Sequence, residues 1–381
     1  MKSSLTGLLV ASIVLVMLLA SCTPTATPAP PVSPTPTSAP VPIAAPVTSP
    51  AETAMQKLVE AAKKEGTVTL YSFNFVGDVG FAMQKGFKDR YGIKVEIITG
   101  RGAEFIERLK TEARIGNRTG DFSEGSQVHL VNMKIAGLTT SLKDLPVLQE
   151  KDIWKVEPAF LDPEAHVLAA YPTYMQPFAN TKLVKPADEP KSWADLLQPK
   201  WKGQILFTDP VVSSNAYIIF QPIIKAGALS EDYLQKLGAQ DLQFVTGPAQ
   251  GIEKLSRGEY PIFGGSQAID ASNAVREGAP LKVLDFKEGI SGQAILQTVI
   301  KDSPHINAAK LFVNWWLSKE GQSVYAKAKG APTIRKDVQS GLPPGLDMDP
   351  AKSVFPTAED LVLQGKLFAD KAWVPQLKKT K

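Results

Sequence analysis

The sequence predicts an α/β protein with two lobes and a ligand cleft between them. Strand-like and helix-like segments alternate from residue 68 to about residue 115, and a second alternating series follows after residue 200. An extended apolar stretch, Tyr171–Thr181, separates the two series. Such alternation favours βαβ units with mostly parallel strands. At 381 residues, the chain is long enough for two lobes of roughly 150 residues each.

The first series starts with an amphipathic helix, about Ala51–Lys64, in which Met55 and Leu58 share one face and which Gly66 ends. The predicted elements that follow are a buried strand at 68–71, a helix at 78–91, a strand at 94–98, a helix at 103–115 and an apolar helix at 125–136. Residues 122–126 lead into this last helix. The strand at 68–71 contains Tyr71, which we expect to be buried.

The second series begins with a short helix at 193–197. The elements predicted after it are strands at 204–207, 260–263, 281–284 and 294–300, and helices at 213–226, 268–277 and 306–318. Trp315 and Trp316 lie on the last helix, and we interpret them as core residues rather than ligand-stacking residues. We assign residues 51–172 plus about 299–345 to lobe 1, and residues 173–298 plus about 346–381 to lobe 2, with Trp373 anchoring the tail.

The N-terminus carries export signals. A basic residue, Lys2, precedes an apolar run and the sequence Leu19-Ala20-Ser21-Cys22, as in a signal peptide over residues 1–21. The ending resembles the lipobox of bacterial lipoproteins, which implies that Cys22 is lipidated. The run is shorter than the ~20 residues of a membrane-spanning helix. The alternative is an ordinary secretory signal with an incidental cysteine. Cys22 is the only cysteine, so the chain has no internal disulfide.

A low-complexity segment follows Cys22. Residues 23–50 contain no charged residue and ten of the 30 prolines, so they cannot bury enough apolar area to fold. We interpret residues 22–50 as a disordered tether between the lipid and the folded part. A recognition segment for a partner is the alternative.

Composition argues against two function classes. The 42 basic and 38 acidic residues are interspersed, which gives no electrostatic footprint for nucleic acid. The three histidines, His129, His166 and His305, are far apart in the chain and show no metal-ligand spacing. There is no nucleophile elbow and no P-loop. The sequence therefore does not predict an enzyme, and no cofactor is expected.

Candidate ligand-binding residues follow the predicted strands, because ligands of open α/β sheets bind beyond the carboxyl ends of strands. The residues selected in this way are Ser72, Asn74, Arg101, Gly102, Ser213, Ser214 and Ser266. Three of these groups have a plainer interpretation: a tight turn at 100–102, helix capping at 213–215 and a permissive turn at 264–267. Glu124 is either a ligand-facing carboxylate or a helix-start residue favoured by the helix dipole. His129 is interpreted as packed or solvated.

The order of these features resembles family 1 extracellular solute-binding proteins of bacterial ABC importers, and within them the ferric-ion-binding branch. The segments that carry the resemblance lie between residues 51 and 334: Ala61–Gly66 leading into Val68–Ser72, Phe87–Val95, Asp121–Glu124, Ala179–Val184, Lys191–Leu197 leading into Pro199–Gly203, and Glu277–Pro280. The resemblance implies a type II periplasmic-binding-protein fold, with two α/β lobes joined by crossover strands. It also implies a permease and an ATPase as partners.

The chain departs from the ferric branch at its metal ligands. Ferric ion favours oxygen anions such as tyrosinate and carboxylate. The region that usually supplies adjacent tyrosines reads Gly264-Gly265-Ser266-Gln267 and contains none. The remaining metal-ligand candidates are Glu124, which matches a glutamate ligand of some members, and Tyr174 on the extended crossover.

The function predicted from the sequence is a lipid-anchored, monomeric solute-binding protein of an ABC importer in the cell envelope, in the periplasm or on the outer face. It captures a solute by hinge closure. The family suggests ferric ion or a ferric–anion complex as the transported ligand. The alternative is a small oxyanionic or polar organic solute, bound for import or for sensing. An enzyme on the same fold is a third hypothesis, for which no nucleophile or base was found.

Overall fold

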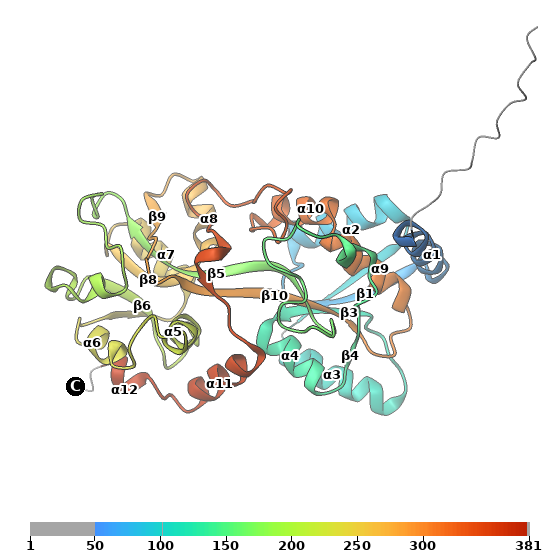
Figure 1. Cartoon of the computed structure of the whole chain (residues 1–381), viewed down its shortest axis with the longest axis horizontal. Coiled ribbons are helices and arrows are strands. Elements are labelled where there is room, and N and C mark those ends of the chain that lie inside the picture. The colour runs from blue at the N-terminus through green and yellow to red at the C-terminus, as the bar shows by residue number, and fades with distance from the viewer. Residues whose placement is uncertain (1–49, 101, 379–381) are drawn as a thin grey trace, which may run out of the picture. The chain divides into compact units, whose positions relative to one another are not determined.

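Two long strands, β5 (Leu168–Asn180) and β10 (Ile290–Ile300), pair antiparallel through the middle of the structure and connect its two halves (Figure 1). The computed structural model describes residues 50–100 and 102–378, all within the unit Thr48–Lys381. Its main sheet has the strand order β2-β1-β3-β10-β5-β8-β6-β7. The predicted signal peptide, Cys22, the tether and Arg101 lie outside the described residues.

Beside β10, three parallel strands form one half of the sheet. They are β1 (Thr67–Ser72), β2 (Lys94–Thr99) and β3 (Phe122–Ser126), with β1 between the other two. The helices of this half are α1 (Pro50–Glu65), α2 (Gly77–Tyr91), α3 (Gly102–Ile115), α4 (Gln127–Ile135), α9 (Ile306–Leu317) and α10 (Lys319–Lys329). In sequence order, α2, α3 and α4 each follow a strand, as the βαβ pattern predicts.

Beside β5, the second half repeats this arrangement with β6 (Ile205–Thr208), β7 (Gln243–Val245) and β8 (Ile262–Gln267). Its helices are α5 (Asn215–Lys225), α6 (Tyr233–Gly238), α7 (Pro248–Ser256) and α8 (Ala268–Arg276). The C-terminal helices are α11 (Ala358–Ala369) and α12 (Val374–Leu377). The short elements are β4 (Thr139–Thr140), β9 (Leu281–Val283), β11 (Ser353–Val354), η1 (Pro146–Gln149), η2 (Ala194–Leu197), η3 (Pro199–Trp201) and η4 (Pro350–Lys352).

The sheet is mixed, which corrects the prediction of a mostly parallel one. All pairings of β5 are antiparallel, and β10 is antiparallel to β3, β4 and β5. The chain enters the second half along β5 and returns along β10, so the two crossover strands must run in opposite directions. Parallel pairing is confined to the βαβ units on either side and to the short β10–β11 pair.

Three element predictions differ from the structure. Residues 122–126 form strand β3, residues 264–267 extend strand β8, and the predicted helix start at Ser213 moves to Asn215. At Gly264 the strand packs directly on the Phe207 ring, because a Cβ atom there would lie 2.0 Å from that ring. Tertiary packing therefore overrides the turn preference of Gly264-Gly265.

The hydrophobic core is divided along the crossover strands. One cluster draws on residues 62–171 and 294–361, and two others draw on residues 175–286 and 342–377. Trp315 and Trp316 are fully buried in the first cluster, where Trp315 meets Phe87 edge to face at 5.6 Å, which confirms their prediction as core residues. Tyr71 is fully buried, also as predicted. The exact lobe boundaries stay a prediction.

The C-terminal segment contacts both halves. Leu346 belongs to a core cluster of the second half, whereas Leu361 on α11 belongs to that of the first. Helix α11 contacts both α4 and α5. Trp373 then stacks on Tyr217 of α5 with ring centroids 5.0 Å apart, so it anchors the tail as predicted.

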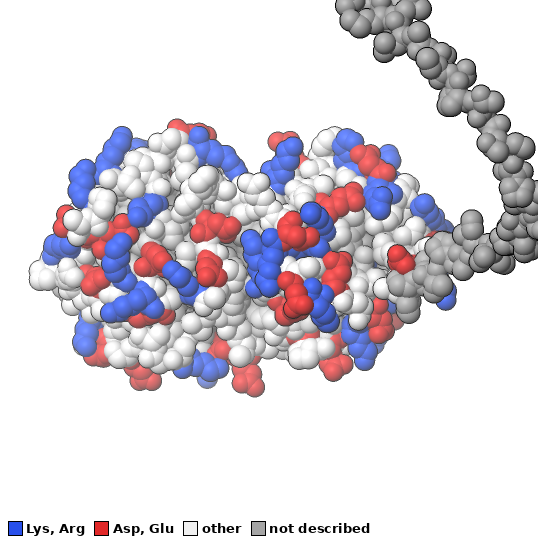
Figure 2. Space-filling model, turned by 45° about the horizontal axis from the view of Figure 1, so that its top comes forward, with Lys and Arg blue, Asp and Glu red and all other residues white. Residues whose placement is uncertain are grey.

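Two surface properties bear on function. Acidic and basic side chains alternate over the face drawn in Figure 2, and neither sign dominates it. Within residues 50–100 and 102–378, no helix is both long and apolar enough to cross a membrane.

Candidate functional site

Glu124 is the centre of a buried hydrogen-bond cluster at the carboxyl ends of β1 and β3. Its Oε1 atom accepts hydrogen bonds from the Ser72 hydroxyl at 2.5 Å, the Phe73 amide at 3.0 Å and the Asn74 amide at 2.9 Å. Its Oε2 atom accepts from Asn74 Nδ2 at 2.9 Å. Three predicted site residues, Ser72, Asn74 and Glu124, are thus brought together, and Glu124 fixes the loop between β1 and α2.

The register of the sheet explains this cluster. Leu70 pairs with Phe122, so Ser72 and Glu124 occupy equivalent positions two residues further along parallel strands. Glu124 is 1% exposed. Burial raises the pKa of its carboxyl, although the hydrogen bonds from Ser72 and Asn74 act in the opposite direction. A ferric ion that bound Oε1 of Glu124 would have to displace donors from Ser72, Phe73 and Asn74.

Tyr174, the second predicted metal ligand, is also enclosed. It is 2% exposed, its hydroxyl has no partner within the described chain, and its ring meets Phe355 at 6.2 Å. Burial raises the pKa of its hydroxyl, and the negative charges of Asp347 and Asp349 add to the increase. Iron ligation needs the phenolate, and in the absence of a metal ion this environment disfavours it. The part of the chain that the structure describes contains no group of three or more His, Cys, Asp or Glu residues that could hold a metal ion. The metal-ligand roles of Glu124 and Tyr174 stay predictions.

The start of α4 carries polar side chains that were not selected from the sequence. Gln127 is 3% exposed and His129 is 7% exposed. Neither the amide of Gln127 nor the ring nitrogens of His129 have a partner among residues 50–100 and 102–378. Buried polar groups without partners cost about 1–3 kcal/mol each. Burial lowers the pKa of His129 to about 4, so its ring is neutral at pH 7.

Helix α3 packs directly on this histidine. A Cβ atom at Gly102 would lie 2.6 Å from the His129 ring, and one at Gly125 would lie 2.7 Å from it. Glycine at 102 therefore lets the N-terminus of α3 approach the first turn of α4, and glycine at 125 leaves room for the same ring beside β3. Ser126 caps α4 by accepting from the His129 amide at 3.4 Å. Of the predicted residues, the structure places Gly102 here.

The predicted serines of the second half lie at helix starts. The Ser213 hydroxyl accepts from the Asn215 amide at 3.3 Å, and Ser214 is the N-cap residue of α5 without a side-chain cap bond. Ser266 is fully buried at the end of β8 and donates to Asp270 at 2.5 Å. The carboxylate of Asp270 also accepts from the Gln267 amide in a capping box. Ser266 is therefore already engaged in starting α8.

Strand pairing shows how the polar residues at the end of β3 lie relative to those at the end of β8. The end of β3 at Ser126 pairs with Ile295 of β10, which pairs with Tyr171 of β5. The end of β8 at Gln267 pairs with Met175 of β5. The carboxyl ends of β3 and β8 therefore lie on opposite sides of the short crossover stretch 171–175. Helices α4 and α8 begin at these ends, with the partial positive charge of their N-termini. Within the described residues, no hydrogen bond or ion pair links Ser72, Asn74 or Glu124 to Ser213, Ser214 or Ser266.

A two-lobed α/β architecture of this kind, with crossover strands and helix N-termini on both sides of the crossover, defines a class of solute-binding proteins. The sequence matches the family of bacterial extracellular solute-binding proteins over residues 82–354, and the chain belongs to this family. This confirms the resemblance and the fold class predicted from the sequence.

Individual relatives differ in their ligands. The chain is 24% identical over 292 residues to a putative 2-aminoethylphosphonate-binding periplasmic protein of Salmonella typhi, covering 72% of this chain and 80% of that one. Its fold is similar to iron-bound HitA from Pseudomonas aeruginosa, with a TM-score of 0.64, 23% identity and coverage of 80% and 98%. It is also similar to AfuA from Actinobacillus pleuropneumoniae with bound fructose-6-phosphate, with a TM-score of 0.61, 23% identity and coverage of 83% and 99%.

Proposed function

We propose that this protein is the solute-binding component of an ABC importer, and that it captures a small organic anion carrying a phosphonate or phosphate group. The observation that carries the choice of ligand is the pair Gln127 and His129, whose buried polar atoms lack partners at the N-terminus of α4. An anion held there accepts hydrogen bonds from the Gln127 amide, from a protonated ring nitrogen of the neutral His129 and from backbone amides of the first turn.

Relatives of this chain include proteins with phosphorus-oxyanion ligands as well as proteins that bind iron. Two of the three proteins compared above are named for, or contain, a ligand with a phosphorus oxyanion, namely 2-aminoethylphosphonate and fructose-6-phosphate. The third contains iron. In this chain, Glu124 is occupied by four donors and Tyr174 is an enclosed phenol, so the residues favour the organic anion over bare ferric ion.

Capture uses the crossover strands as a hinge. A solute that contacts α4 in one half and the loops before α5 and α8 in the other stabilises the closed state by its differential affinity for that state. Ser213 and Ser214 are the second-half residues we assign to this contact. The closed form then docks on a membrane permease with its ATPase, and the protein acts as a monomer.

The proposed location is the outer side of a membrane, in the periplasm or on the outer face. The support is the sequence Leu19-Ala20-Ser21-Cys22 and the charge-free segment 23–50. We expect the mature protein to begin at a lipidated Cys22. Intact-mass measurement of the membrane fraction tests this, because Cys22→Ser abolishes the lipid mass and releases the protein from the membrane. An unmodified cysteine would contradict the anchor and leave the ligand proposal unaffected.

Native mass spectrometry of the protein as purified tests the ligand. We expect a 1:1 adduct with a phosphorus-containing organic anion, weakened in Gln127→Leu and retained in Gln56→Leu, a control on the exposed face of α1. An iron adduct, or an adduct that Gln127→Leu leaves unchanged, would contradict the assignment.

A further inference from the structure

A cavity open to solvent lies beside the C-terminal segment, and neither Gln127 nor His129 lines it. Its volume is about 700 Å³. Its walls are largely apolar and include Val156, Phe160, Met348, Pro350 and Phe355. Such a volume is typical of small-ligand sites, which bury an apolar body and orient it with a few polar groups.

A backbone bridge places two lysines at this cavity. Trp154 and Arg335 form an isolated antiparallel bridge. The amides of Lys155 and Lys336 donate to the carbonyls of Ile334 and Ile153, both at 2.7 Å. Because successive side chains alternate across extended backbone, Trp154 and Arg335 point inward, where they are 5% and 4% exposed. Lys155 and Lys336 leave on the opposite face, and both line the cavity.

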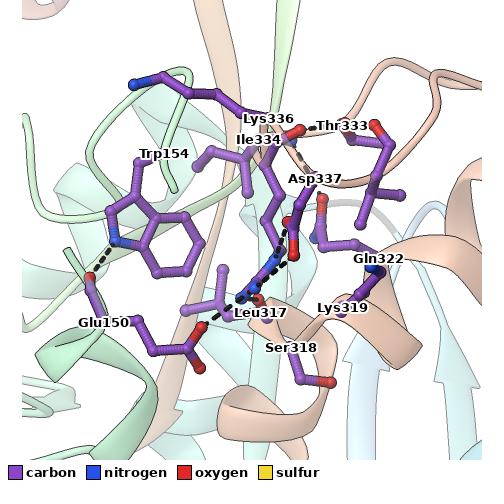
Figure 3. A network of polar contacts seen from close by, with 12 residues as sticks. Glu150, Trp154, Leu317, Ser318, Lys319, Gln322, Thr333, Ile334, Lys336 and Asp337 are labelled. Atoms are coloured by element: carbon purple, nitrogen blue, oxygen red, sulfur yellow. Dashed lines mark hydrogen bonds and ion pairs between the residues drawn. The ribbon is translucent and has the colours of Figure 1, made fainter. Parts of the chain in front are cut away.

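Contacts of the two inward-pointing side chains, Trp154 and Arg335, stabilise this bridge. The Arg335 guanidinium donates to Asp337 at 2.8 and 3.1 Å, to Glu150 at 3.0 Å and to the Leu317 carbonyl at 3.2 Å. It also lies 5.3 Å from the centre of the Trp154 ring. Figure 3 shows that the Lys336 side chain extends away from the contacts of Asp337 and Glu150.

The charges at the cavity do not balance. The ammonium group of Lys155 has no ion-pair or hydrogen-bond partner within the described chain. That of Lys336 donates only to the Asp152 carbonyl, at 3.2 Å. Asp349 is the one acidic residue in the lining. Among the lining residues, two cations and one anion leave an excess of one positive charge, which favours an anionic ligand of low charge.

We propose that this cavity binds an amphiphilic organic monoanion. Its apolar body lies against Phe160 and Phe355, whose rings meet edge to face at 5.2 Å, and its acid group pairs with Lys155 and Lys336. Phe355 also covers the crossover strands: it contacts Tyr174 of β5, and a Cβ atom at Gly292 of β10 would lie 2.8 Å from its ring. A ligand here therefore contacts a residue that spans both connections between the halves.

Titration of the full chain with 8-anilinonaphthalene-1-sulfonate, an aromatic monoanion, tests the proposal. We expect saturable fluorescence enhancement at one site, displaced by 3-phenylpropionate and not by the neutral 3-phenylpropanol. The double variant Lys155→Glu with Lys336→Glu should weaken binding by about tenfold or more, because two attractive contacts become repulsive. The control, Lys57→Glu with Lys88→Glu, makes the same change of net charge on exposed faces of α1 and α2 and should bind as the parent does.

Two results would overturn the proposal. One is equal binding by the two double variants while far-ultraviolet circular dichroism and melting temperature show both to be folded. The other is loss of binding in Gln127→Leu but not in the Lys155/Lys336 variant, which would assign the dye to the site at α4. Because Gln127→Leu is the variant that tests the proposed function, the failures of the two proposals are distinguishable.

Discussion

The Ser72 hydroxyl donates to Oε1 of Glu124 at 2.5 Å, and this bond joins the carboxyl end of β1 to the neighbouring strand β3. The same hydroxyl oxygen accepts from the amides of Asn74 at 3.2 Å and Phe75 at 2.8 Å. Ser72 and Glu124 together therefore accept from three consecutive backbone amides, those of residues 73–75, in the turn that leads into α2. In this chain, Glu124 shapes the loop between β1 and α2 instead of presenting a free carboxylate.

Glu124→Gln should destabilise the protein. The amide keeps one acceptor oxygen but turns a second donor toward Asn74, so at least one charge-assisted hydrogen bond is lost. We expect the free energy of unfolding to fall by about 2 kcal/mol, measured by urea denaturation. Glu60→Gln on the exposed face of α1 is the control and should change it by less than about 0.5 kcal/mol. Equal effects of the two variants would refute the structural role of Glu124.

His129 should give the protein a pH-dependent stability. Burial lowers the pKa of its ring to about 4, whereas an unfolded histidine titrates near 6.5. Between these values the unfolded chain binds the proton and the folded chain does not. Stability is therefore complete above about pH 6.5 and falls as the pH drops toward 4, by up to about 3 kcal/mol. His129→Leu should reduce this loss of stability between pH 6.5 and pH 4, as measured by urea denaturation of the ligand-free protein. An unchanged pH profile would show that the ring is not buried as a neutral group.

Substitution by alanine should change the stability of the protein in opposite directions at two glycines. At Gly264 the added Cβ would lie 2.0 Å from the ring of Phe207, which is 2% exposed and cannot move aside. We expect Gly264→Ala to cost about 2–3 kcal/mol. Gly365 lies on the exposed side of α11 with nothing within 4 Å of such an atom. Gly365→Ala should stabilise the protein by up to about 1 kcal/mol. Thermal denaturation distinguishes them, and shifts of the same sign would contradict the packing described.

Arg335→Lys should be costly although it keeps the charge. Lysine cannot reproduce the forked contacts with Asp337 and Glu150 or the stacking on Trp154. We expect a loss of about 1–3 kcal/mol in the free energy of unfolding. Arg90→Lys is the matched control, because Arg90 and Glu320 form an exposed pair at 3.6 Å. It should cost less than about 0.5 kcal/mol. If the control costs as much as Arg335→Lys, the buried network contributes nothing specific.

The helices whose apolar residues recur at a regular helical spacing could be predicted from the sequence. The helices at 51–64, 78–91 and 306–318 agree with α1, α2 and α9 to within one residue at each end. Their apolar residues recur at helical spacing, and glycine ends the first two. The burial of Trp315 and Trp316 follows from the same pattern.

The candidate site was harder to predict, because it depends on strand register. Residues 122–126 have little intrinsic preference for a strand, and pairing with both β1 and β10 makes them one. That pairing turns Glu124 toward Ser72, and it moves the helix start to Gln127. The available signal for Gln127 was its place directly after Gly125-Ser126, a glycine and a good N-cap residue.

Isothermal titration calorimetry tests the central claim most directly. The ligands to compare are phosphate, 2-aminoethylphosphonate, fructose 6-phosphate and ferric citrate. The account predicts 1:1 binding of at least one organic phosphorus oxyanion, with affinity reduced about tenfold or more in Gln127→Leu through the loss of buried hydrogen bonds. Binding of ferric citrate alone, or binding of an organic anion that Gln127→Leu does not change, would contradict it.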